Sequence, residues 1–317
     1  MGIQHALVMG EMCVDIVVHR PASVPVLGYP LWAGDVEIRL GGSATYSGLA
    51  LQGLGIDTSF SLPLGDDALA RQLTAQLALR GLHTEGICFV RGQPSMKAVT
   101  ICTEDDHQVL ASSPPPLYLD EMVDVSVVGI DLLYFGGYTL YPELWTPATA
   151  GCFARARRNG VLVVLDTQIL PLPADRYVTR ALRADIFSEI DVLLLNRKEA
   201  SAFTGVEDIE AAALNLAQAG PRLVVAKLGS QGSMTCDQGH IRYQRGFRVS
   251  ASDLIGAGDY FGAGLSYGLL QGWDLDRAAS FANAAAATGI SQRDRSGFPS
   301  TLADVENLLS QTNDSER

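Results

Sequence analysis

The segment richest in chemical possibilities is Asp253-Leu254-Ile255-Gly256-Ala257-Gly258-Asp259, which runs into a predicted helix. Small residues in the first turn leave backbone N–H groups uncovered at the positive end of the helix, which suits a phosphoryl group during its transfer. Asp259 falls in that turn, where a carboxylate can face the same pocket and act as a general base toward a hydroxyl. The alternative is an ordinary helix start with an acidic first turn and glycines for close packing.

Two further segments place polar or small residues where ligands commonly bind. Gly41-Gly42-Ser43-Ala44-Thr45 is a second glycine turn into a helix, without the GxGxxG spacing of a dinucleotide site, and a simple chain turn explains it equally well. Asn196 and Glu199 follow a strand and lie three residues apart, so that they share a helix face and could hold hydrated Mg²⁺. A capped helix start with solvated charges is the competing interpretation.

Residues at two predicted strand ends are the last candidates for ligand binding. Lys227-Leu228-Gly229-Ser230-Gln231-Gly232 could let a purine lie against backbone, with Lys227 reaching phosphates, or could be an ordinary hairpin turn. Asp15 ends a strand that faces the same region, although a lone aspartate at a strand end is more often solvated or a cap. The order of these signals along the chain is more informative than any one of them.

The elements that must position these residues alternate between strands and helices. Strands are expected at 5–9, 58–63, 132–135, 161–165, 192–195 and 223–227, with helices at 43–54, between Asp67 and Arg80, and between the later strands. This alternation predicts a largely parallel sheet covered by helices on both faces. A hairpin (233–236 with 240–243) and three helices near 256–271, 274–291 and 300–309 follow. Early strands, roughly 12–40 and 86–112 with a turn at Asp105-Asp106-His107, could form a small β lid.

Composition limits the function classes. The chain has 317 residues, 47% of them hydrophobic, which is enough for a large core, so we expect one α/β domain over 1–317. A net charge of −12 without a basic run argues against nucleic-acid binding. No apolar run is long enough for a membrane span, and we identify no signal peptide. Five scattered cysteines, without a CxxC pair, are typical of reduced thiols and a cytoplasmic protein.

The ordered set of motifs resembles the ribokinase-like (PfkB) family of carbohydrate and nucleoside kinases over nearly the whole length. The family signature DTxGAGDxFxAG corresponds to 253–264, GGxxxNxAxxLxxLG to 41–55, GDD to 65–67 and NxxE to 196–199. The resemblance implies a three-layer sandwich with a mostly parallel central sheet and a β-sheet lid. It implies ATP-dependent, Mg²⁺-assisted phosphorylation of a hydroxyl on a small sugar or sugar-like substrate.

The resemblance also assigns roles to individual positions. Asp259 matches the catalytic base, and Gly256, Ala257 and Gly258 match the anion hole. Asn196 and Glu199 match residues that organise Mg²⁺, largely through water. The remaining matches concern ligands: Gly229, Gly232 and Asn283 for nucleotide; Asp15, Gly41 and Gly42 for substrate; and Asp253 for K⁺ in some members. Lys227, whose assignment rests on its place at a strand end, joins the nucleotide residues.

Two departures bear on the substrate. Tyr46 stands where the family has Asn, and could donate one hydrogen bond or offer a ring face to the substrate. Leu254 replaces the usual Thr beside the K⁺ position. A sugar kinase is our leading hypothesis; a nucleoside kinase, with Tyr46, Tyr29 and Trp32 as stacking surfaces, and a non-catalytic sensor are the alternatives. An exposed edge of the lid favours a homodimer through the lid.

Overall fold

A nine-stranded sheet forms the centre of the protein. The structure, a computed structural model, describes residues 3–19, 32–102, 107–117, 129–168, 186–250, 254–291 and 300–315. The strand order is β13-β12-β11-β10-β9-β8-β1-β4-β5, parallel from β11 to β5 and antiparallel at β12 and β13. These strands are β1 (His5–Gly10), β4 (Asp57–Gly65), β5 (His83–Val90), β8 (Leu132–Gly136), β9 (Leu162–Asp166), β10 (Val192–Asn196), β11 (Leu223–Lys227), β12 (Ser233–Asp237) and β13 (His240–Gln244). The predicted parallel sheet and C-terminal hairpin are confirmed.

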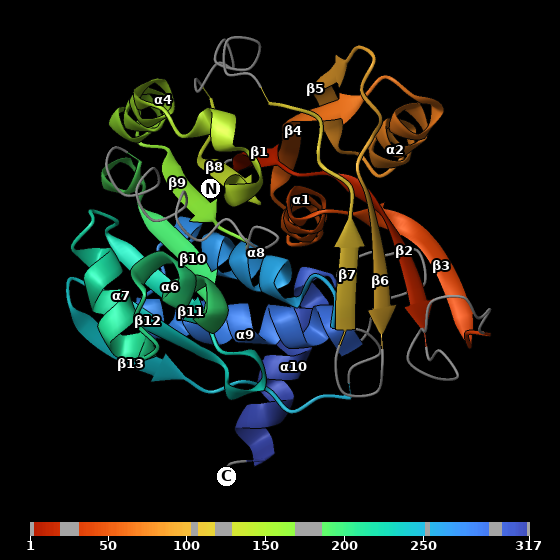
Figure 1. Cartoon of the computed structure of the whole chain (residues 1–317). Coiled ribbons are helices and arrows are strands. Elements are labelled where there is room, and N and C mark those ends of the chain that lie inside the picture. Colours follow the sequence, from red (N-terminus) through yellow and green to blue (C-terminus); the bar gives the residue numbers. More distant parts are fainter. Residues whose placement is uncertain are drawn as a thin grey trace.

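Helices cover both faces of this sheet, as the strand–helix alternation predicted (Figure 1). The α-helices are α1 (Ser43–Gly53), α2 (Ala68–Ala78), α4 (Pro147–Arg158), α6 (Arg197–Thr204), α7 (Ile209–Ala217), α8 (Ala257–Leu270), α9 (Leu275–Ser291) and α10 (Leu302–Ser315). Four short 3₁₀ turns are η1 (Tyr138–Leu140), η2 (Pro142–Leu144), η3 (Phe187–Glu189) and η4 (Gly229–Gln231). None of the helices in the described ranges has the length and apolar character needed to cross a bilayer.

Several inner strands contribute side chains to two hydrophobic cores, because successive side chains point to opposite faces of a sheet. In β8, Leu132 and Tyr134 enter the core beneath α1, α8 and α9, whereas Leu133 and Phe135 enter the core beneath α4, α6 and α7. Strands buried on both faces are typical of a parallel sheet in a three-layer sandwich. The fold class predicted from the sequence is confirmed.

A separate four-stranded sheet has the order β3-β2-β6-β7 and lies to one side of the α/β body (Figure 1). Its strands are β2 (Cys13–His19), β3 (Asp35–Gly41), β6 (Lys97–Cys102) and β7 (His107–Ala111). The predicted second lid segment, 86–112, begins too early, because 86–90 belong to β5 and pair with β4 in the large sheet. There β5 covers backbone groups of β4 that would otherwise form an open edge. Tyr29, Asp105, Asp106 and Asp253 lie outside the described residues.

The two faces of the small sheet differ in their surroundings. Side chains of one face, including Asp15, Ala98 and Thr100, line a cavity against the α/β body. The opposite face presents apolar side chains to the surface, among them Val36 and Ile38. The small sheet therefore closes one side of the cavity and offers an apolar face outward.

Candidate active site

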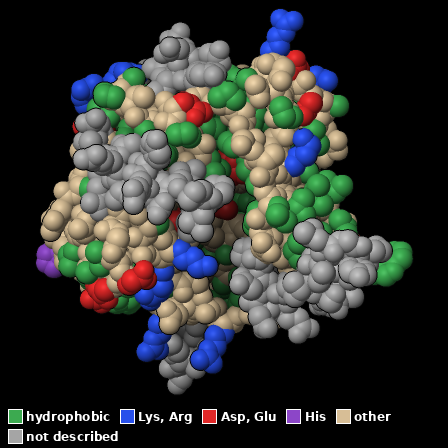
Figure 2. Space-filling model, in the orientation of Figure 1, with side chains coloured by type: hydrophobic (Ala, Val, Ile, Leu, Met, Phe, Trp, Pro, Cys, Tyr) green, Lys and Arg blue, Asp and Glu red, His purple; other side chains and the backbone are tan. Residues whose placement is uncertain are grey.

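A cavity of about 860 Å³ lies between the small sheet and the N-terminal ends of α1 and α8. Figure 2 shows this region as a hollow between two lobes, with acidic side chains deep inside it. The lining residues are Glu11, Cys13, Asp15, Gly42, Ser43, Tyr46, Met96, Ala98, Thr100, Val109, Leu110, Ala111, Leu140, Gln168, Glu199, Leu254, Ile255, Gly256, Ala257, Gly258 and Asp259. Segments far apart in the chain thus meet at one site.

The N-terminus of α8 faces the cavity through its first turn. Gly256 caps the helix with φ of 82°, a backbone conformation that side chains other than glycine rarely adopt. The N–H of Ala257 donates to the carbonyl of Leu254 at 3.3 Å, and the N–H of Asp259 donates to the carbonyl of Gly256 at 3.0 Å. Two of the N–H groups at this end are therefore engaged in turn bonds, and the Ala257 bond is long enough to be weak.

Asp259 is held by the start of the other cavity-facing helix. The Ser43 hydroxyl, at the first residue of α1, donates to Oδ1 of Asp259 at 2.5 Å. Burial in the cavity raises the pKa of Asp259 to about 8, with the Asp166 charge adding to the rise, while Lys227 and the Ser43 bond act in the opposite direction. A buried carboxyl with a raised pKa is a better proton acceptor once it is ionised.

Lys227 and Asp166 form a buried ion pair beside this carboxyl. Nζ of Lys227 lies 2.7 and 2.8 Å from the two carboxylate oxygens of Asp166, and the Tyr134 hydroxyl donates to the same carboxylate at 3.1 Å. A Cβ on Gly258 would lie only 3.2 Å from Nζ, so the ammonium sits directly against the first turn of α8. The Asp166 and Glu199 charges raise the pKa of Lys227 despite its burial.

Asn196 and Glu199 bind each other at the start of α6. The Asn196 side chain accepts from the Glu199 N–H at 3.0 Å, and Glu199 accepts from the Asn196 N–H at 2.8 Å, which forms a capping box. Glu199 also accepts from Nδ2 of Asn196 at 2.7 Å and from the Thr167 hydroxyl at 2.9 Å. Burial raises the pKa of Glu199. The capped-helix interpretation and the ligand interpretation thus apply to the same side chains.

Asp15 occupies the opposite end of the cavity and is fixed from three sides. The Tyr46 hydroxyl donates to Oδ2 of Asp15 at 2.5 Å, and the Cys13 thiol donates to Oδ1 at 3.4 Å. A Cβ on Gly41 would lie 2.3 Å from Cγ of Asp15, so the carboxylate needs a glycine beneath it. The Tyr46 ring packs edge-on against Tyr260, with centroids 6.0 Å apart. Tyr46 therefore orients Asp15 and lines this end of the cavity.

The glycine loop after β11 forms a separate group. Gly229 begins η4 and Gly232 follows it, with φ of 61° and 99°. Asn283, on α9, donates through Nδ2 to the Ser233 hydroxyl at 3.0 Å and to the Gln244 carbonyl at 3.4 Å. The structure thus brings Asn283 against the loop that holds the two glycines, although none of these three residues lines the 860 Å³ cavity.

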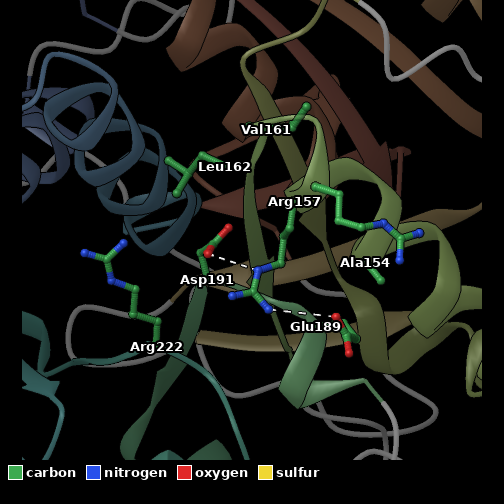
Figure 3. A pocket seen from close by; sticks show the side chains of 9 residues that line it. Ala154, Arg157, Val161, Leu162, Glu189, Asp191 and Arg222 are labelled. Atoms are coloured by element: carbon green, nitrogen blue, oxygen red, sulfur yellow. Dashed lines mark hydrogen bonds and ion pairs between the residues drawn. The ribbon is translucent and has the colours of Figure 1, made fainter.

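A second cavity, of about 580 Å³, lies at the other end of the sheet, where β9, β10 and β11 begin (Figure 3). Arg157 lines this cavity and forms two ion pairs, with its Nε 3.1 Å from Asp191 and its Nη1 3.9 Å from Glu189. Asp191 in turn accepts from the Val163 N–H at 3.0 Å. These contacts hold α4 against the starts of the strands, which gives Arg157, Glu189 and Asp191 a structural role.

Comparison with known proteins decides the family. The family model described as "pfkB family carbohydrate kinase" matches residues 4–300. The chain belongs to the pfkB family of carbohydrate kinases. It is 28% identical to a ribokinase of Haemophilus influenzae, covering 95% of this chain and 97% of the relative. It is 27% identical to a 5-dehydro-2-deoxygluconokinase of Photobacterium profundum, covering 80% of each.

Solved structures show the same fold for this pfkB kinase. A ribokinase of Thermotoga maritima superposes with a TM-score of 0.77 at 21% identity, covering 97% of this chain and 100% of that one. A ribokinase of Arabidopsis thaliana complexed with ribose and ATP gives 0.76 at 23%, covering 97% and 99%. The resemblance stated from the motifs is confirmed. ATP-dependent phosphorylation of a sugar is the activity that the family supports.

Most predicted site residues of this pfkB kinase meet in the structure. Those that line the cavity are Asp15, Gly42, Tyr46, Glu199, Gly256, Ala257, Gly258 and Asp259. Lys227 packs on Gly258, Gly41 lies under Asp15, and Asn196 is bound to Glu199. Sequence reasoning missed Glu11, Ser43 and Asp166. Asp166 carried a usable signal, because it ends β9. The prediction that Asp15 ends a strand was wrong, because Asp15 is the third residue of β2.

The charges around Asp259 fit a magnesium nucleotide. Asp166, Glu199 and Asp259 surround the single ammonium of Lys227, which leaves carboxylates in excess among the described residues here. No group of three His, Cys, Asp or Glu side chains in the described ranges is arranged to ligate a metal directly. The Glu199 carboxylate already accepts three hydrogen bonds from the protein. These residues fit a metal held mainly by the nucleotide and water.

Proposed function

We propose that Asp259 is the general base that takes the proton from the substrate hydroxyl during phosphoryl transfer from ATP. The observation that carries this proposal is its position, a half-buried carboxyl in the first turn of α8, facing the cavity, with its pKa raised to about 8. The Ser43 bond fixes one oxygen and leaves the other for a substrate hydroxyl. A positioned carboxylate of this kind contributes roughly 10²–10⁴-fold to the rate.

The first turn of α8 is the proposed anion hole for the transferring phosphoryl group. Gly256, Ala257 and Gly258 carry no side chain beyond a methyl, so an oxygen can approach their N–H groups at the positive helix end. The Ala257 N–H would exchange its 3.3 Å bond to Leu254 for this contact. Lys227, packed on Gly258, adds a positive charge on the same side.

Two groups of residues are proposed to bind the magnesium nucleotide. Asn196 and Glu199 would hold Mg²⁺ through water, and the ion, when bound, neutralises charge on the phosphates. Gly229, Gly232 and Asn283 would line the base and ribose region, supported by the bond from Asn283 to Ser233 beside Gly232. A K⁺ requirement through Asp253 is tested by comparing turnover in K⁺ and Na⁺ salts.

The substrate side is proposed to consist of Asp15, Gly41, Gly42 and Tyr46 beneath the small sheet, which acts as a lid. The sugar alternative is preferred over the nucleoside alternative. Tyr46 is the one aromatic side chain among the described lining residues, and its hydroxyl is committed to Asp15. Trp32 is 90% exposed and does not line the cavity. Stacking surfaces for a base are therefore poorly supported.

The apolar outer face of the small sheet supports a homodimer through the lid. Ile38 is 71% exposed and Val36 is 55% exposed on this face. Light scattering that shows a dimer in the wild type and a monomer in Ile38→Lys is the expected result, and a wild-type monomer contradicts it. A cytoplasmic location is supported by the five cysteines, all of which are free thiols.

ATP consumption tests the assignment of the base. Wild type, Asp259→Asn and the surface control Asp276→Asn are assayed with Mg²⁺ and K⁺ against sugars, sugar acids, cyclitols and nucleosides. We expect turnover on a sugar in wild type and control, and a loss of about 10²–10⁴-fold in Asp259→Asn with ATP binding retained. Unchanged turnover in Asp259→Asn would remove that residue from the role.

A further inference from the structure

Carboxylates form one wall of the 860 Å³ cavity, where Glu11, Glu199 and Asp259 line it from the α/β body. A fourth carboxylate, Asp15, lies on the inner face of the small sheet, and Glu11 and Asp15 are each only 4% exposed. Acidic side chains are visible at the bottom of the hollow in Figure 2. Ionised carboxylates accept hydrogen bonds and cannot donate them. This wall is therefore complementary to a ligand that offers several donors.

Apart from Asp15, the opposite wall is mostly apolar. It comes from the inner face of the small sheet and the segment before it, with Met96, Ala98, Val109 and Ala111 facing the cavity beside Thr100. A sugar ring offers hydroxyl donors at its rim and C–H groups on its faces, so it matches both walls. A carboxylate on the ligand would find acceptors on one side and hydrocarbon on the other.

The cations nearest to the cavity are already paired. Lys227 binds both oxygens of Asp166, and Arg39, the neighbour of Asp15 across the β2–β3 pair, lies 3.3 Å from Glu37. Neither side chain lines the cavity, and the lining drawn from the described ranges contains no lysine, arginine or histidine. No charged side chain in that lining would compensate the charge of an anionic substrate, and the N–H groups of α8 that line it are assigned above to the transferring phosphoryl group.

Glu11 is the carboxylate in this wall to which neither the motifs nor the proposed chemistry gives a role. It follows β1, and its Oε2 accepts from the Ser43 N–H at 3.1 Å. A Cβ on Gly137 would lie 3.2 Å from Cβ of Glu11 and 3.5 Å from Oε2, so the glycine makes room for the side chain. Gln168 also hydrogen-bonds to the Glu11 side chain. Glu11 is thus fixed in place while facing the cavity.

We propose that this cavity selects an uncharged, polyhydroxylated substrate over its carboxylate analogues, and that Glu11 is a specificity-determining residue for that choice. The inference rests on the proposed function, because it concerns the substrate of the same site. A substrate carboxylate ~6 Å from the Glu11 carboxylate, at an effective dielectric constant of about 20, binds about 100-fold more weakly than a neutral group. Asp15 adds to the same discrimination.

The test compares matched pairs that differ in one charged group and keep the carbonyl that closes the ring: D-glucose with D-glucuronate, and D-fructose with 2-keto-D-gluconate. D-ribose is assayed beside them as a further neutral sugar. The 5-dehydro-2-deoxygluconate ion is included because a relative carries that name. Ligand-induced thermal shifts measure binding and kcat/KM measures turnover, both at pH 8, one unit above the pKa of about 7 to which burial raises Glu11. The variants are Glu11→Gln, which keeps the acceptor for Ser43, Glu11→Asp, which keeps the charge, and Asp276→Asn, a surface control 64% exposed.

We expect at least one neutral sugar to be preferred about 100-fold over its acid by the wild type. Glu11→Gln should reduce that preference at least tenfold, while Glu11→Asp and Asp276→Asn keep it. Thermal melting of each variant without ligand checks that it folds. The preference of the wild type for neutral sugars is measured on the wild type alone, so it can be tested even if a variant does not fold.

Two results would overturn the inference. A sugar acid that binds or turns over as well as its neutral partner refutes the substrate class, even if Asp259→Asn confirms the base. If Glu11→Gln changes the binding of neutral and acidic ligands equally, Glu11 does not determine the specificity between them. The proposed function fails separately, through turnover that survives Asp259→Asn, and a wild type stabilised by none of the neutral sugars counts against both.

Discussion

The two neighbours of Asp259 should shift its pH dependence in opposite directions. The Ser43 hydroxyl donates to the ionised carboxylate and lowers its pKa, so Ser43→Ala raises that pKa above its present value of about 8. The charge of Asp166 opposes ionisation, so Asp166→Asn lowers the pKa and also frees Lys227 to interact with Asp259. Because the base must be deprotonated, activity rises with pH up to this pKa.

The sizes of these shifts follow from the contacts. A hydrogen bond to a charged group contributes about 1.5–3 kcal/mol, and one pKa unit corresponds to about 1.4 kcal/mol. Removing the 2.5 Å bond from Ser43 should therefore raise the pKa by about 1–2 units. With a wild-type pKa of about 8, roughly a tenth of Asp259 is ionised at pH 7, and Ser43→Ala reduces that fraction by a further factor of about 10 or more.

The assay is kcat/KM for the preferred sugar between about pH 6 and pH 10, since this ratio reports groups of the free enzyme. Ser201→Ala is the matched control, because its hydroxyl also donates to a carboxylate, Glu207, at 2.9 Å, but on the surface. We expect the alkaline-rising limb to move up in Ser43→Ala, down in Asp166→Asn, and not at all in the control. Shifts in the same direction, or a flat wild-type profile, would refute the electrostatic argument.

Three further changes test separate parts of the structure. Tyr46→Phe removes the 2.5 Å bond to Asp15, and should raise KM for the sugar about 10-fold or more with little change in kcat, as steady-state kinetics would show. Lys227→Met leaves the carboxylate of Asp166, which is 1% exposed, without its ammonium, and should lower the free energy of unfolding by about 3–5 kcal/mol in denaturant titration. Arg157→Ala should lower that free energy by about 1–2 kcal/mol through lost contacts with its carboxylate partners, yet leave kcat/KM unchanged if the second cavity is structural.

The local elements could be predicted from the sequence because their signals are local. Helix α1 ends where Gly55 adopts a φ of 88°, and Asp67 caps α2 by accepting from the Ala70 N–H at 2.9 Å. Likewise, the alternation of strands and helices along the chain was sufficient to predict the three-layer sandwich. The boundary of the small sheet was wrong because β5 and β6 have similar strand composition, and only their partners distinguish them.

Contacts across the chain could not be predicted in the same way. Ser43 and Asp259 are 216 residues apart, and Asp166 and Lys227 are 61 apart, so no spacing rule joins them. Glu11 was overlooked because it follows a short apolar strand and precedes no recognisable cap or motif. The rule that ligands gather at the carboxyl ends of parallel strands would have selected both Glu11 and Asp166, which stand at the ends of β1 and β9.

The same burial that raises the pKa of the proposed base also lowers the free energy of unfolding. The pKa values of Glu11 and Asp259 rise to about 7 and about 8, well above those of unfolded chains, so the folded protein holds these protons more tightly. The penalty is absent below the unfolded pKa values near 4, grows as pH rises, and is complete above about pH 8. Over the interval in which Asp259 becomes competent to accept a proton, these two groups therefore make the fold less stable. The buried Lys227–Asp166 pair, the Ser43 bond and the Glu199 capping box hold the site together against that cost.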